Sequence, residues 1–280
     1  MELLSLREVQ LAELDILLNF DAFCKEHGLR YSLDGGTLIG AVRHKGFIPW
    51  DDDIDVCMPR PDYDRFLSLC RALPSRYDVI TFQNSKWPQP FAKIQDKHIR
   101  AQEPMLQGVM DEYLWIDIFP FDGFIDDPEK FSSTFGTIRG TVEKISRSTY
   151  KAAPGASLVK RFAKALFVAV NDILPVRKSL KKRLANSFRA LDYGASDRVF
   201  CYANQFEQIV LPKAGFEEAV SMEFEGYMLP CMSCWDECLT LHYGDYMWIP
   251  PENERQTHYL KAWRVETEDL DGQNKGGDVK

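Results

Sequence analysis

The sequence predicts an α+β fold: a mixed β-sheet flanked by helices, with a helical insertion. Two observations carry this prediction. Short apolar runs with strand-like patterns lie on both sides of a long helical stretch, residues 131–191. The chain also opens with a strong helix pattern and then alternates between strand and helix signals. With 280 residues, of which 45% are hydrophobic, it can bury a substantial core.

We divide the chain by these patterns. Residues 1–130 are expected to form the catalytic core, and 131–192 a helical insertion or subdomain. Residues 193–265 are expected to complete the catalytic domain, and the polar segment 266–280 to be a disordered tail.

Composition predicts a cytoplasmic protein. No basic start followed by an apolar segment marks a secretory signal, and no apolar run approaches the roughly 18 residues that span a bilayer. Seven cysteines in that setting favour reduced thiols over a disulfide scaffold.

The net charge of −8 is unevenly distributed. Residues 157–190 hold nine basic side chains and one acid, so this segment carries +8 and the rest of the chain −16. An acidic protein is a poor nucleic-acid binder, which excludes that partner class. The basic segment could contact an anionic membrane at the inner face, or be an ordinary solvated helix face.

The first 33 residues predict a helix followed by a short strand. Ser5 and Glu8 form a capping-box pattern, and Gly28 is a natural C-terminal stop. Apolar residues recur at helical spacing at Leu11, Leu14 and Leu18. Residues 29–33 then read as extended, and the glycine pair 35–36 ends them.

Four aspartates in five positions follow, and the strand 54–58 overlaps them. Strand alternation places Asp53 and Asp55 on one face and Ile54 on the other. Clustered carboxylates repel unless a cation neutralises them, and carboxylate oxygens suit Mg²⁺. Of the other two, Asp51 is expected to support the pair and Asp52 to be exposed.

Downstream segments follow the same logic. Helices are expected at 61–73 and 235–242, and the helical stretch 131–191 should break near Pro154 and at Pro175. Strands are expected at 77–82, 90–94, 114–120, 198–202, 209–211 and 222–229.

Asp117 interrupts the apolar strand 114–120. A buried carboxylate without a partner is costly, so we expect one. It could be a third acid facing a shared metal, or it could bond an arginine or backbone donors.

The order of these parts, a Gly-Gly-Thr turn, an Asp-x-Asp strand and a later strand-borne Asp, is similar to the nucleotidyltransferase fold. Divalent metal there bridges phosphate oxygens and neutralises developing charge. Asp53 and Asp55 would hold the metal, and Asp117 would complete the site and deprotonate or orient the acceptor hydroxyl. Gly35 and Gly36 would let backbone N–H groups approach a phosphate, with the Thr37 hydroxyl adding a donor.

Longer blocks carry a closer resemblance. LDGGTLIGAVRHKGFIPWDDDIDVCMPRPDYDRF, KIQDK, WIDIFPFDG and YGDYMWIPP, with Arg255 and His258 after it, resemble the LicD family in sequence and order. The resemblance implies a nucleotidyltransferase-like fold with Mg²⁺ or Mn²⁺ dependence and no organic cofactor. It also implies transfer of a phospho-alcohol, such as phosphocholine or a polyol phosphate, from a CDP-alcohol to a glycan or lipid-linked glycan. Asp53, Asp55 and Asp117 match the family's acids.

Supporting roles are expected for several cations. Arg43, His44 and Lys93 could contact the donor pyrophosphate, with a structural role as the alternative for each. Arg255 and His258 could close over the site, although a structural role is favoured for both.

Two rival functions and one rival metal follow from the same residues. A true nucleotidyltransferase would transfer the nucleotide itself, and a non-catalytic protein would bind glycan or nucleotide. Zinc at Cys231, Cys234, Cys238 and His242 is disfavoured, because the last three would spread along one helix.

Overall fold

The computed structural model describes residues 2–102, 110, 112–151, 157–173, 175–204, 209–255 and 260–265, with 172 and 173 described in backbone only. Its α-helices are α1 (Leu6–His27), α2 (Gly35–Ile39), α3 (Arg60–Leu69), α4 (Pro128–Thr149), α5 (Leu158–Ile173), α6 (Val176–Arg189), α7 (Lys213–Glu217) and α8 (Trp235–Tyr243). Its strands are β1 (Ser32–Leu33), β2 (Asp55–Pro59), β3 (Tyr77–Ile80), β4 (Ala92–Gln102), β5 (Tyr113–Gly123), β6 (Arg198–Phe200), β7 (Val210–Pro212), β8 (Ala219–Phe224), β9 (Tyr227–Met232) and β10 (Lys261–Arg264). A π-helical turn, Gly40–His44, continues α2.

The main sheet is mixed, as the sequence predicts. Strands β1, β2, β5, β4 and β10 are neighbours in that order; β3 adds to β4, and β6 and β7 extend from the end of β5. The β2–β5 pairing is parallel, and the other pairings described in this sheet are antiparallel. A separate hairpin joins β8 and β9.

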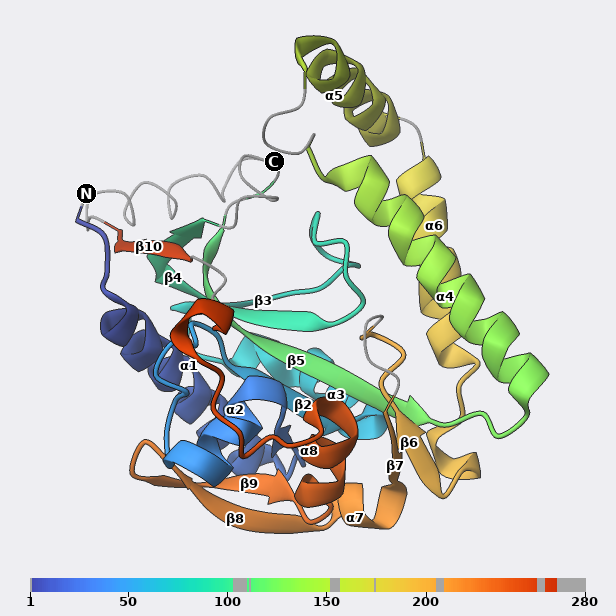
Figure 1. Ribbon diagram of the computed structural model, residues 1–280. Helices are drawn as coiled ribbons and strands as arrows, with labels where there is room; N and C mark the ends of the chain where they lie inside the picture. Colours follow the sequence, from blue (N-terminus) through green and yellow to red (C-terminus); the bar gives the residue numbers. More distant parts are fainter. Residues whose placement is uncertain are drawn as a thin grey trace.

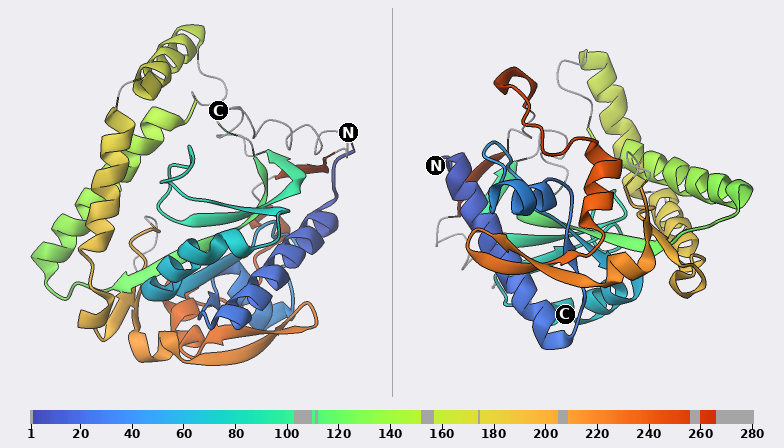
Figure 2. Two further views of the ribbon diagram at one scale, coloured as in Figure 1. Left: turned by 180° about the vertical axis from the view of Figure 1, so that it is seen from behind. Right: turned by 60° about the horizontal axis from the view of Figure 1, so that its bottom comes forward.

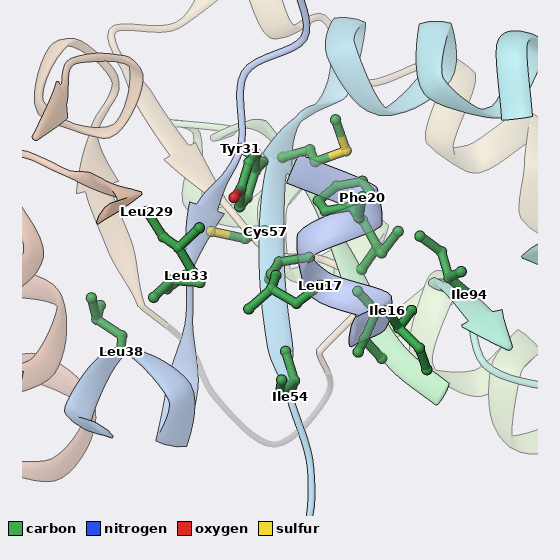
Figure 3. Packing of buried hydrophobic residues seen from close by; sticks show 14 of the residues in the cluster. Ile16, Leu17, Phe20, Tyr31, Leu33, Leu38, Ile54, Cys57, Ile94 and Leu229 are labelled. Atoms are coloured by element: carbon green, nitrogen blue, oxygen red, sulfur yellow. The ribbon is translucent and has the colours of Figure 1, made fainter. Parts of the chain in front are cut away.

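Helices cover both faces of this sheet. Figure 1 shows α2 and α8 in front of it, and the reverse view in Figure 2 shows α1 and α3 on the other side. Figure 3 shows Ile16, Leu17 and Phe20 of α1 beside β2 and Ile54, which directly precedes that strand. All four side chains are at most 1% exposed, so the main core lies between α1 and the sheet.

Helix α1 is defined by its caps. The Ser5 side chain accepts from the Glu8 N–H, the Glu8 carboxylate accepts from the Ser5 N–H, and Gly28 adopts the left-handed conformation at φ 60°. The predicted capping box and stop are therefore confirmed. The predicted apolar stripe is partly wrong, because Leu11 is 47% exposed while Val9, Glu13 and Ile16 are buried.

The helical stretch comprises α4, α5 and α6. Helices α4 and α6 run antiparallel beside the sheet, and α5 lies at their far end (Figure 1). A second core packs α4 and α6 against β6, with Ile138, Leu184 and Phe200 fully buried. The break at Pro175 is confirmed, while the one predicted near Pro154 lies outside the described residues. No helix in the described ranges combines the length and hydropathy needed to cross a bilayer.

Two strand predictions need correction. Residues 222–229 are not one strand but part of the β8–β9 hairpin, because Glu225 and Gly226 turn the chain with φ of 52° and 81°. Strand β10 was not predicted; it is a four-residue strand that pairs with β4. The predicted disordered tail, 266–280, lies outside the described residues, and the domain boundaries stay a prediction.

Candidate active site

Three charged side chains form a row across adjacent strands at the middle of the sheet. Asp55 of β2 stands opposite Asp117 of β5 in the parallel register, and Lys93 of β4 stands opposite Asp117 in the antiparallel register. Opposed residues on neighbouring strands point to the same face. The structure thus brings two of the predicted acids together from positions 62 residues apart in the chain.

Asp117 has a cationic partner. The Lys93 ammonium lies 3.0 Å from Asp117 Oδ1, and the Lys93 side chain is 5% exposed. This ammonium also lies 3.9 Å from the centre of the Trp115 ring and 4.3 Å from that of Trp87. Cation–π attraction and the ion pair together stabilise a charge in a largely desolvated position. The partner expected for Asp117 is therefore a lysine, which neither predicted alternative named.

Backbone and hydroxyl groups hold Asp55 in place. Its N–H donates to Thr37 Oγ1 at 2.9 Å, and its carbonyl accepts from the Asp34 N–H at 3.0 Å. Thr37 is 4% exposed, so this hydroxyl anchors the start of β2 from within α2. Its predicted contribution to phosphate binding stays a prediction.

The glycine pair lets carboxylates approach α2 closely. Gly35 has φ +53°, and a Cβ there would lie 3.0 Å from Asp55 Oδ2. A Cβ at Gly36 would lie 2.6 Å from Asp51 Oδ2, closer than real Cβ contacts come. The structure shows that these glycines make room for the acids, and the backbone approach to a phosphate stays a prediction.

Negative charge accumulates around Asp55. Its pKa is raised well above the ordinary aspartate value, first by burial and then by the charges of Asp53, Asp117, Asp34 and Asp51. Each of these four carboxylates thus lies close enough to interact with Asp55, although Asp34 was not predicted as part of the site. The signal in the sequence that could have revealed Asp34 was its position directly before the glycine pair 35–36.

The acid predicted to be exposed is buried. Asp52 is 5% exposed, and its Oδ2 accepts from the backbone N–H of Leu260 at 3.1 Å. It therefore fastens the C-terminal segment at Leu260 to the acidic segment 51–55, which we call the acidic turn. Asp51 and Asp53 are partly exposed, and the Asp51 carbonyl accepts from Gln10 Nε2 at 2.9 Å.

A further acid, Glu13 of α1, reaches the same region and was missed. It is 1% exposed, and its Oε2 lacks a hydrogen-bond partner among the described residues. Its pKa is raised well above normal by burial first, then by the charges of Asp53, Asp52, Asp51 and Asp117. A glutamate between buried apolar positions of α1 was the signal that could have revealed it.

Replacing Glu13 with glutamine should stabilise the protein at neutral pH in the presence of a chelator. The raised pKa means that stability falls as pH rises above the unfolded value near 4.5, because folding then disfavours the ionised acid. The neutral amide removes that loss, so we expect a gain of about 1–3 kcal/mol at pH 7 that disappears below about pH 4.5. Urea unfolding across this pH range measures both. A gain that persists unchanged at pH 4 would contradict the electrostatic cause.

Arg43 connects the π-helical turn to the C-terminal loop. Its Nη1 donates to the carbonyls of Tyr246 and Trp248 at 2.7 and 2.8 Å, and its Nε donates to His44 Nε2 at 2.9 Å. Burial, and then the Arg43 charge, lower the pKa of His44, which keeps the imidazole neutral as an acceptor at pH 7. These contacts give Arg43 the structural role that was its alternative; pyrophosphate binding by either residue stays a prediction.

Arg255 stacks on Trp50. Its guanidinium carbon lies 4.2 Å from the centre of that ring, and its Nε donates to the Pro250 carbonyl at 3.2 Å. Trp50 directly precedes the acidic turn, so the C-terminal loop packs beside it. His258 lies outside the described residues.

A cavity of about 80 Å³ opens beside the acids. It is lined by Asp34, Gly35, Asp55, Phe119, Phe121, Cys201, Asn204, Ile209, Cys238, His242 and Tyr243. The Tyr243 hydroxyl lies 3.7 Å from where a Gly35 Cβ would be. Helix α8 thus forms one wall of the cavity, a role that the sequence did not indicate.

The fit of a divalent cation can be tested against these residues. The donors are carboxylates, the ligands that Mg²⁺ and Mn²⁺ prefer, and a cation would relieve the repulsion that raises the Asp55 pKa. In the described ranges, however, no three His, Cys, Asp or Glu side chains are placed to hold an ion as they stand. Donor chemistry therefore fits, while Asp117 is paired with Lys93 rather than placed in a ready-made triad.

The cysteines near α8 lie as the sequence suggests. Cys234 caps α8, and Cys238 and His242 follow along the helix, which spreads them over roughly 12 Å. Burial raises the pKa of the Cys234 thiol to about 11, so the free thiol stays protonated at pH 7.

The fold and this site define a nucleotidyltransferase-type domain with an acidic centre. The family model described as LicD/FKTN/FKRP, nucleotidyltransferase domain, matches residues 28–146. The chain is 31% identical over 277 residues to the lipopolysaccharide cholinephosphotransferase LicD of Haemophilus influenzae, covering 93% of this chain and 98% of that protein. It is 59% identical over 94 residues to the human ribitol 5-phosphate transferase FKRP, covering 34% of this chain and 17% of FKRP. The chain belongs to the LicD family and is an enzyme of the LicD phosphotransferase type.

Proposed function

We propose that this protein transfers a phospho-alcohol, phosphocholine or a polyol phosphate, from a CDP-linked donor to a hydroxyl of a cell-surface glycan or its lipid-linked precursor. One observation carries the proposal: Asp55 and Asp117 stand opposite each other on parallel strands, beside the glycine start of α2. The named relatives, a cholinephosphotransferase and a ribitol 5-phosphate transferase, support the class of cargo.

The reaction balances without a further reagent. The acceptor oxygen forms a bond to the phosphorus that bears the alcohol, and the bond from that phosphorus to the bridging oxygen breaks. CMP leaves with the bridging oxygen, and the acceptor hydroxyl loses its proton.

We assign a separate role in this reaction to each residue of the site. Asp53, Asp55 and Asp117 would hold Mg²⁺ or Mn²⁺, which when bound neutralises charge on the phosphate oxygens. Asp117 would also accept the proton of the acceptor hydroxyl or orient that hydroxyl. Lys93 would position Asp117 through their 3.0 Å ion pair. Gly35 keeps the approach to Asp55 open, because a side chain there would meet the carboxylate.

Purified protein with Mg²⁺ should release CMP from one of CDP-choline, CDP-ribitol or CDP-glycerol when a glycan acceptor is present. Chromatography quantifies CMP, and mass spectrometry of the acceptor identifies the added phospho-alcohol. A thermal-shift screen of the same donors selects the one that binds, since a ligand present at 100 times its Kd stabilises by about 2.7 kcal/mol.

The rival functions give different products. A true nucleotidyltransferase would leave a cytidylylated acceptor and release the phospho-alcohol. A non-catalytic binder would show a thermal shift and no product with any donor. Asp53→Asn should abolish turnover by the proposed reaction, and full activity in that variant would refute the metal assignment.

A further inference from the structure

Helix α5 presents its apolar side to solvent. Its large apolar side chains are 42–79% exposed, with Phe162 at 74%: they are Leu158, Val159, Phe162, Leu166, Phe167 and Val170. A helix of a globular protein normally turns such residues toward the core. Scattered exposed apolar residues are ordinary, but six on one 16-residue helix form a contiguous patch.

The helical geometry of α5 explains why these apolar side chains are exposed together. At 100° per residue the six side chains fall within about half of the helix circumference. Lys160, Arg161 and Lys164 fall on the opposite half, and the Lys164 ammonium donates to the Arg147 carbonyl of α4. The helix is thus attached to the protein at the partly buried Lys164, while Lys160, Arg161 and the apolar side chains stay exposed.

Charge indicates what would cover this face. The segment 157–190 carries +8 while the rest of the chain carries −16. Two copies meeting through α5 would bring two basic segments together, which costs electrostatic energy. An anionic bilayer surface instead offers acyl chains to the apolar side chains and headgroup charge to the basic ones.

We propose that α5 lies in the interface of an anionic membrane and holds the protein there peripherally. With 16 residues the helix is about 24 Å long, and no described helix is suited to crossing a bilayer. Its place at the far end of α4 and α6 keeps the acidic body away from the lipid charge (Figure 1). The segment lies outside the family match at residues 28–146, so the proposal is independent of the proposed function.

Co-sedimentation with vesicles tests the proposal. The full chain should bind vesicles of phosphatidylcholine with one quarter phosphatidylglycerol, and bind pure phosphatidylcholine at least tenfold more weakly. Phe162→Glu should weaken vesicle binding tenfold or more, since it removes an exposed aromatic side chain that the membrane would bury. The double variant Lys160→Gln, Arg161→Gln should weaken vesicle binding roughly 25-fold, at about fivefold per charge. Met228→Glu, at a side chain 59% exposed on the β8–β9 hairpin, is the matched control and should bind normally.

Three outcomes would overturn the proposal: no vesicle binding, equal binding to both vesicle types, or equal loss in the Met228 control. Sedimentation velocity tests the alternative that a second copy of the protein covers this face. A dimer that Phe162→Glu dissociates, in a protein that ignores vesicles, would assign the face to a second copy. Circular dichroism and CMP release from a soluble donor and acceptor show that each variant is folded.

Discussion

Replacing Asp55 with asparagine is expected to lower kcat/KM for the CDP-linked donor by roughly three decades or more, because it removes a charged ligand of the proposed cation. Asparagine keeps the shape of the side chain, so the close contact with Gly35 is preserved. The Asp55 N–H and carbonyl bonds to Thr37 and Asp34 involve backbone atoms and should persist. The loss should therefore be chemical and not structural.

Two measurements separate these causes. In chelator at pH 7 the variant should unfold at no lower a urea concentration than the wild type, because the raised Asp55 pKa marks an ionised form that the fold disfavours. Asp64→Asn, at a side chain 64% exposed, is the matched control and should keep full activity. An active Asp55→Asn enzyme would remove this residue from the site.

Replacing Arg60 with alanine is expected to cost about 3–5 kcal/mol of unfolding free energy, the largest stability effect that the structure predicts. Arg60 binds Asp122 through two bonds of 2.6 and 2.9 Å, and Asp122 is fully buried. Burial already raises the pKa of Asp122, and the Arg60 charge opposes that rise. Without Arg60 a carboxylate would be left buried without its cation.

The pair also joins three elements. Arg60 opens α3, and Asp122 is the penultimate residue of β5. The Arg60 guanidinium lies 5.0 Å from the centre of the Phe188 ring of α6. The double variant Arg60→Ala, Asp122→Ala should recover part of the loss in urea unfolding, because it also removes the stranded charge. Arg139→Ala, in a solvent-exposed pair with Glu143 on α4, is the control and should cost at most about 1 kcal/mol. Equal losses of unfolding free energy in Arg60→Ala and Arg139→Ala would show that the buried ion pair contributes no more to stability than the exposed one.

Local pattern was sufficient for much of this fold. The capping box and Gly28 bounded α1, and period-2 alternation located β2 and the acids that precede it. Each of these signals depends on residues that are close in the sequence, so it can be recognised without knowledge of the tertiary structure. The same holds for α8, which the sequence predicted at residues 235–242.

Contacts between residues far apart in the sequence determine the features of the site that were not predicted. That Asp117 would pair with Lys93 depends on the register of β4 against β5, which the sequence does not express. The burial of Asp52 depends on a segment more than 200 residues away, at Leu260. Glu13 was overlooked because the stripe chosen for α1 included Leu11, which the fold leaves exposed.

The order of synthesis gives the Asp52–Leu260 hydrogen bond a consequence for the nascent chain. Every acid of the site has been translated once residue 117 emerges, yet the groups that fasten their surroundings come much later. The carbonyls of Tyr246 and Trp248 bind Arg43, and the Leu260 N–H binds Asp52. Synthesis proceeds at about 5–20 residues per second, so the acidic centre would lack these bonds for roughly 7–30 seconds after residue 117 emerges. Activity should therefore appear in a stalled chain only after residue 260 has cleared the exit tunnel.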